Sequence, residues 1–109
     1  MIFTMNVLDE KGWEPADGYG EGSLQKILRE EENGCKTMLL KLPKHFHMDA
    51  HSHRCAEQHY VIDGAYTINN IVFRKGSYQR IPPNEEHGLF ESEEGATILV
   101  SCDPLMQEH

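Results

Sequence analysis

Apolar residues come in short runs along the chain, and turn-forming residues separate the runs. From residue 36 onward the pattern predicts strands over residues 36–42, 57–62, 65–68, 71–73, 77–81, 88–91 and 96–102. Gly64 is expected to end the strand that begins at Glu57, and Asn69 with Asn70 to form a two-residue hairpin turn. Many short strands at this spacing are typical of an all-β sandwich or barrel. The segments between them are too short for helical crossovers, which disfavours a parallel sheet.

Residues 23–33 fit two structures. Leu24, Ile27 and Leu28 recur at helical spacing, and Ser23 could cap a helix there. The same stretch could be a strand, because an Asn-Gly pair at 33–34 before an apolar run is a hairpin signal. The local pattern leaves both open. The first 22 residues contain Trp13 and four glycines, and they predict an irregular arm that Trp13 anchors by packing.

Length and charge narrow the class of protein. A chain of 109 residues is one domain by length, and its apolar runs are far shorter than the about 20 residues of a membrane helix. Its net charge of -8 disfavours nucleic acid as a partner. Three cysteines without a CxxC pair fit a reducing compartment, and the N-terminus lacks a signal-peptide pattern. We therefore expect a cytoplasmic protein with neither nucleic-acid nor membrane partners.

Histidine is the unusual component of this sequence, with seven copies. In a strand, His51 and His53 would share one face, and Glu57 and His59 would share a face of the next strand. His87 follows Glu57 by thirty residues. Two histidines, a carboxylate and a further histidine can complete a four-ligand site if two strands meet. Such ligands suit a divalent Zn, Fe, Mn, Ni or Co ion with one or two positions left for water or substrate.

The spacing of these residues resembles the two motifs of the cupin superfamily. The first motif corresponds here to His51-x-His53-x3-Glu57-x6-Gly64, and the second to Gly76-x5-Pro82-x-Asn84-x2-His87. Three positions depart from the family pattern, where His45 and Asn84 replace glycines and Glu91 replaces an asparagine. The arrangement of Trp13, a glycine-containing loop and the two motifs is also similar to the cupin half of zinc-dependent anti-sigma factors.

The resemblance implies an all-β double-stranded β-helix, also called a jelly roll or cupin barrel. One divalent ion would lie in a mouth of the barrel, bound by His51, His53, Glu57 and His87. The implied organisation is a single cupin domain, with an N-terminal arm at 1–22, a barrel at 23–103 and a tail at 104–109. The resemblance favours a strand for residues 23–29. It also implies a homodimer, because many small cupins pair through edge strands and arms.

Several other residues are candidates for roles near the metal. Alternation aims His59 inward, where it would move protons, or would instead be held by a polar group of the barrel. Tyr78 and Arg80 are candidate substrate contacts, since an inward Arg80 would bind an anion. We expect His45 and His47 at the rim or surface, and Cys55 to be inert or close to the metal entrance.

Two functions follow from these expectations. The first is a metal-dependent enzyme, dioxygenase- or isomerase-like, acting on a small oxygenated molecule at a 3-His/1-Glu site. The alternative is a non-catalytic module that binds or senses a small-molecule ligand through its metal ion. A purely structural zinc site is a third reading.

Overall fold

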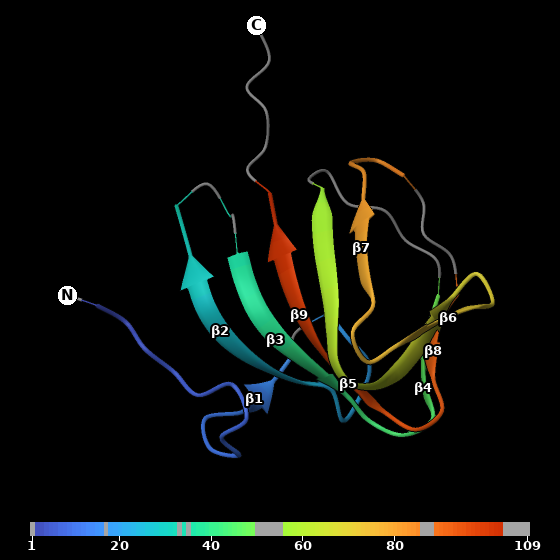
Figure 1. The fold of residues 1–109 in the computed structure, drawn as a ribbon, viewed down its shortest axis with the longest axis horizontal. Helices are drawn as coiled ribbons and strands as arrows, with labels where there is room; N and C mark the ends of the chain where they lie inside the picture. The colour runs from blue at the N-terminus through green and yellow to red at the C-terminus, as the bar shows by residue number, and fades with distance from the viewer. Residues whose placement is uncertain are drawn as a thin grey trace, which may run out of the picture.

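A computed structural model describes residues 2–16, 18–32, 34, 36–49, 56–85 and 89–103. These residues form nine strands, shown in Figure 1. Their bounds are β1 (Glu14–Pro15), β2 (Leu24–Glu30), β3 (Lys36–Leu42), β4 (Phe46–Met48), β5 (Glu57–Ile68), β6 (Ile71–Arg74), β7 (Tyr78–Ile81), β8 (Phe90–Ser92) and β9 (Ala96–Cys102). Within the described ranges no helix has the length and apolarity that a bilayer crossing requires.

All the strand pairs are antiparallel, and β5 joins the two halves of the fold. One layer runs β1-β2-β3-β9-β5-β7, and the other contains β4, β8 and β6 with the second half of β5. In Figure 1 the first layer curves across the molecule, and β4, β6 and β8 gather beyond the bend in β5. The all-β jelly roll is therefore confirmed.

The strand β5 does not end at Gly64, so that expectation was wrong. The pairing of β5 with β9 shifts register between Val61 and Asp63, and Gly64 has a φ of 73°. A side chain at Gly64 would overlap the carbonyl oxygen of Gly95 on the neighbouring chain segment. The glycine therefore allows a bulged bend instead of a stop, and β5 continues into the second layer.

Residues 24–30 form the strand β2, which settles the ambiguity over 23–33 in favour of the hairpin. β2 pairs with β3, and the amide of Gly34 donates to the carbonyl of Glu31 in the connecting turn at 2.9 Å. Pairing on both sides overrides the helical spacing of the apolar residues. The turn at Asn69 and Asn70 is also confirmed, with φ values of 52° and 66° between the paired residues Ile68 and Ile71.

Alternate side chains of the strands fill the barrel. The inward positions of β3, β5 and β9 carry buried residues such as Leu40, Val61 and Ile98. At the centre the rings of Tyr66 and Phe90 stack with centroids 4.8 Å apart. The short β4 was not expected, because its sequence Phe-His-Met has too few residues to show an alternation.

The arm crosses the outer face of the first layer. The Lys26 ammonium lies 4.7 Å from the centre of the Trp13 ring, and that of Lys41 lies 5.4 Å from it. Lys26 is almost fully buried, and its ammonium also donates to the carbonyl of Asp9. Trp13 therefore anchors the arm by cation–π contacts with the outside of the sheet.

Candidate metal centre

Glu57 and His59 lie side by side on the inner face at the start of β5. Both are 3% exposed. In the sheet they stand opposite Cys102 and Val100 of β9, and opposite Ile81 and Gln79 of β7. The expectation that these two side chains share one face is therefore met, and the face is the inside of the barrel.

A hydrogen-bonded row extends from Glu57 through His59 to Tyr66. Nε2 of His59 lies 3.0 Å from Oε1 of Glu57, and Nδ1 lies 3.0 Å from the hydroxyl of Tyr66. Burial raises the pKa of Tyr66 well above its usual value, and the carboxylate of Glu57 raises it further. We call Glu57, His59 and Tyr66 the inner cluster.

Tyr66 was missed as a partner of His59 because the two residues are seven positions apart. In a regular strand an odd separation puts two side chains on opposite faces. The bulge between Val61 and Asp63 changes the phase, so both point inward. Gly64, which was expected to end the strand, was the only sequence signal of this irregularity.

Tyr19 brings the arm close to the inner cluster. Its ring packs against the buried core, and burial raises its pKa far above the usual value. Negative charge on Glu57 and on Cys102 raises the pKa of Tyr19 further. No pattern in residues 1–22 predicts a contact with the barrel interior, so the position of Tyr19 near Glu57 was not expected.

Three of the four predicted metal ligands, His51, His53 and His87, lie outside the described residues, as does Cys55. Glu57 is the one predicted ligand that the structure places. Within the described part of the chain, no group of three or more His, Cys, Asp or Glu side chains could hold an ion. The four-ligand set therefore stays a prediction.

Tyr78 and Arg80 lie on the outer side of the sheet, at the edge strand β7. They stand opposite Tyr60 and Gln58, which alternate with the inward residues of β5. The Tyr78 hydroxyl donates to Oε1 of Gln58 at 2.8 Å, and Arg80 lies 3.7 Å from Asp103. The structure does not bring either residue to Glu57, and their contact with a substrate stays a prediction.

His45 and His47 are exposed, at the surface where the sequence placed them. Nδ1 of His45 lies 3.1 Å from a carboxylate oxygen of Glu93, and Nε2 of His47 lies 3.5 Å from Asp49.

His45 has a φ of 61° and Asn84 a φ of 60°. Both stand where the cupin motifs usually have glycine, and the backbone keeps the left-handed conformation that glycine favours.

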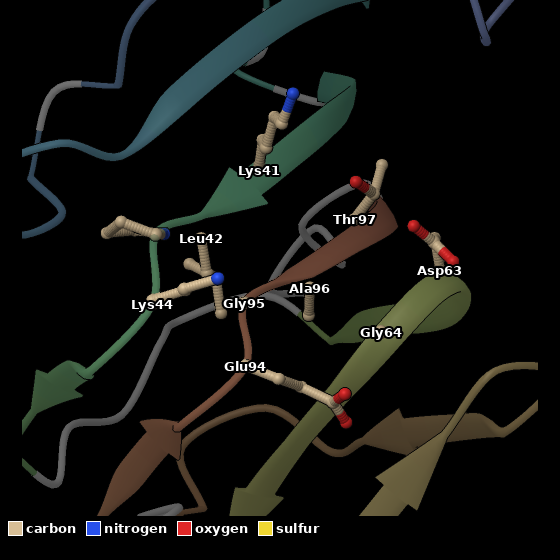
Figure 2. A pocket seen from close by; sticks show the side chains of 10 residues that line it. Lys41, Leu42, Lys44, Asp63, Gly64, Glu94, Gly95, Ala96 and Thr97 are labelled. Atoms are coloured by element: carbon tan, nitrogen blue, oxygen red, sulfur yellow. The ribbon is translucent and has the colours of Figure 1, made fainter.

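One hollow lies where β3, β5 and β9 meet. It has a volume of about 560 Å³ and surrounds Gly64 and Gly95, with charged side chains from Lys44, Asp63 and Glu94 (Figure 2). Glu57, His59 and Tyr66 are not among the residues that line it, so this hollow is separate from the inner cluster. Of the predicted site residues that the structure describes, none lines it.

The fold is that of a cupin. The family model described as the ChrR cupin-like domain matches residues 4–106, and the chain belongs to this family. The resemblance to the cupin half of anti-sigma factors is thereby confirmed. A search of curated proteins found no match.

Solved structures share the fold at low sequence identity. A chain of the Rhodobacter sphaeroides SigE complex with the anti-sigma ChrR is 24% identical, with a TM-score of 0.72, over 88% of this chain and 51% of that one. This chain thus spans about half the length of that chain. An acetylacetone dioxygenase from Acinetobacter johnsonii is 12% identical, with a TM-score of 0.77, over 94% of this chain and 74% of that one. An RmlC-like cupin from Ralstonia eutropha is 20% identical, with a TM-score of 0.75, over 93% of this chain and 69% of that one.

Proposed function

We propose that this chain binds one divalent metal ion through His51, His53, Glu57 and His87. The observation that carries the proposal is the burial of Glu57 inside the barrel, at the position of the first cupin motif. A buried carboxylate loses its hydration and needs hydrogen bonds or a cation in return. His59 supplies one such contact, and a divalent ion would supply the opposite charge.

The described residues fit such an ion. A metal ligand must be deprotonated, and ligating carboxylates are oriented by a neighbouring hydrogen bond. Glu57 has this arrangement, with Nε2 of His59 at 3.0 Å from its Oε1. The imidazole and carboxylate donors suit Zn, Fe, Mn, Ni or Co, and the type of ligand does not distinguish among these metals.

Metal content tests the site. We expect about one ion per chain in protein purified without added metal, and its loss in both Glu57→Ala and His87→Ala. Glu94→Ala is the matched control, because Glu94 is an exposed carboxylate that is not among the proposed ligands. Elemental analysis of the four proteins, with circular dichroism to verify folding, gives the answer. Full retention of metal in both ligand variants would exclude the site.

For the chemistry, we propose a metal-dependent enzyme that acts on a small oxygenated molecule in a dioxygenase- or isomerase-like reaction. The bound ion would polarise an oxygen of the substrate. The fold shared with an acetylacetone dioxygenase supports this proposal. In such an enzyme His59 is the described residue that could move a proton, although both its ring nitrogens already have partners.

The alternative is a non-catalytic module that binds or senses a ligand through its metal. Membership of the ChrR cupin-like family supports it, as does the fold shared with a chain of the SigE–ChrR complex. Incubation of the iron-loaded protein with acetylacetone and dioxygen addresses one substrate of the enzyme proposal. Consumption of acetylacetone that disappears with the metal supports an enzyme, and tight binding of unchanged acetylacetone supports the module.

We further propose a homodimer. Ile2, Phe3 and Leu8 of the arm are exposed, and Tyr60 and Tyr78 are exposed on the outer face of the sheet. Exposed apolar side chains in such numbers are typical of an interface. Light scattering should give twice the chain mass of 12.5 kDa. A mass of one chain would exclude the dimer.

The cytoplasmic location and the absence of a nucleic-acid partner stay predictions.

A further inference from the structure

The inner cluster contains three buried polar side chains that are joined in one row. Glu57 and His59 are 3% exposed, and Tyr66 is 1% exposed. The two distances that join them are both 3.0 Å, one at each ring nitrogen of His59. A histidine whose two nitrogens both have partners is held in one ring orientation, and its partners decide where its protons lie.

Counting protons in this row selects one tautomer of His59. An ionised carboxylate only accepts, so Nε2 must carry the proton that it donates to Oε1 of Glu57. Among the described residues, the Tyr66 hydroxyl has one hydrogen-bond partner, Nδ1 of His59. If Nδ1 also carried a proton, the hydroxyl would accept it and leave its own hydrogen buried without an acceptor. The neutral imidazole protonated at Nε2 satisfies all three groups.

Packing holds Tyr66 in the position that this role requires. Its ring stacks on Phe90 with centroids 4.8 Å apart and lies 5.5 Å from the ring of Phe73. The ring of His59 is also tilted against Phe90 at 6.2 Å. The raised pKa of Tyr66 keeps its hydroxyl protonated, as a donor must be.

We infer that Tyr66 is a positioning residue for the metal centre, because its hydroxyl donates to Nδ1 and holds the ring of His59 in one orientation, and His59 then orients the carboxylate of Glu57. This inference rests on the proposed metal site. Partners one step removed from a metal ion change its affinity by about 10- to 100-fold when they are removed. The geometry therefore assigns a function at the metal to a phenol that belongs to neither cupin motif.

The variant Tyr66→Phe tests the inference, since it removes one oxygen and keeps the stacked ring. We expect zinc to be lost to a competing chelator at about tenfold lower chelator concentration than from the wild type. Tyr60→Phe is the matched control, because Tyr60 lies on the same strand and is exposed on the outer face. Zinc retention in Tyr66→Phe equal to that of the control would overturn the inference.

A spectroscopic measurement does not depend on the metal. The ¹⁵N chemical shifts of His59 in the protein as purified should show a neutral ring protonated at Nε2, with Nδ1 shifted by the hydrogen bond from the Tyr66 hydroxyl. In Tyr66→Phe the shift of Nδ1 should move to that of a ring nitrogen without a donor. An Nδ1-protonated ring or an imidazolium in the wild type would overturn the inference even if Tyr66→Phe failed to fold. If Glu57→Ala kept its metal, the proposed site would fail, and the His59 spectrum would still decide the role of the hydroxyl.

Discussion

Two clusters that contain charged groups lie on opposite sides of the same sheet, and they are built differently. The inner cluster takes Glu57, His59 and Tyr66 from β5 alone. The outer cluster, which we define as Trp13, Lys26 and Lys41, takes one residue each from the arm, β2 and β3. One strand therefore builds the candidate site, whereas three separate segments hold the arm.

The chemistry of the two clusters differs in the same way. In the inner cluster a carboxylate contacts a directional donor, so the position of each proton matters. In the outer cluster two ammonium groups lie over an aromatic face, an attraction that tolerates small movements. We conclude that the inner cluster is suited to setting the geometry of a site and the outer cluster to attaching a segment.

The largest expected effect comes from breaking the bend that forms the inner cluster. Gly64→Ala places a Cβ against the carbonyl of Gly95 and strains a φ of 73°. We expect the free energy of unfolding to fall by about 3 kcal/mol or more, measured by denaturant titration. Gly76→Ala is the control, because its φ of 92° is also strained but nothing lies within 4 Å of the added Cβ. Gly76→Ala should lower the free energy of unfolding by only about 1 kcal/mol. Equal losses would mean that the close approach to Gly95 does not matter.

A smaller effect should follow from breaking the outer cluster. Lys26→Ala removes a buried ammonium that contacts Trp13 and the Asp9 carbonyl, and we expect a loss of about 2 kcal/mol. The arm should become sensitive to limited proteolysis, while metal content stays that of the wild type. Lys41→Ala, at an exposed residue farther from the ring, should lose about 0.5 kcal/mol. A change of metal content in Lys26→Ala would contradict the division of roles between the clusters.

The smallest expected effect concerns the inner phenol at alkaline pH. The pKa of Tyr66 is raised by burial and by Glu57, so the folded chain keeps a proton that the unfolded chain releases above pH about 10. The retained proton contributes to the free energy of unfolding in full below that pH, and this contribution is lost as the pH rises above it. Between pH 10 and 11 the free energy of unfolding should fall by about 1 kcal/mol less in Tyr66→Phe than in the wild type. Tyr60→Phe should follow the wild type, and unfolding curves at the two pH values measure the difference.

The sequence predicted the elements that depend on spacing and failed on those that depend on irregularity. The motif spacing identified the jelly roll, and the alternation correctly put Glu57 and His59 on one inward face. The contact of His59 with Tyr66 could not be predicted, because a bulge reverses the alternation between them. Lys26 shows the converse, since its charge suggests exposure but a tryptophan distant in sequence covers it.

The facing of Tyr78 and Arg80 was open for a related reason. Whether a residue of β7 points inward depends on its register against β5, and the sequence of β7 does not contain that register. The pairing of Gln58 with Arg80 decides it, because Gln58 alternates with the inward residues of β5. Predicting the facing of an edge strand therefore requires knowledge of its neighbour.

The twelve-residue strand β5 pairs with β6, β7, β8 and β9, so both layers depend on the same stretch of backbone. Neither layer can open fully while the other stays intact, since opening either one releases hydrogen bonds of β5. The slowest-exchanging amides of the two layers should therefore share a single opening free energy in native-state hydrogen exchange. In a chain built in this way, the strand that carries the candidate site also makes the whole fold a single cooperative unit.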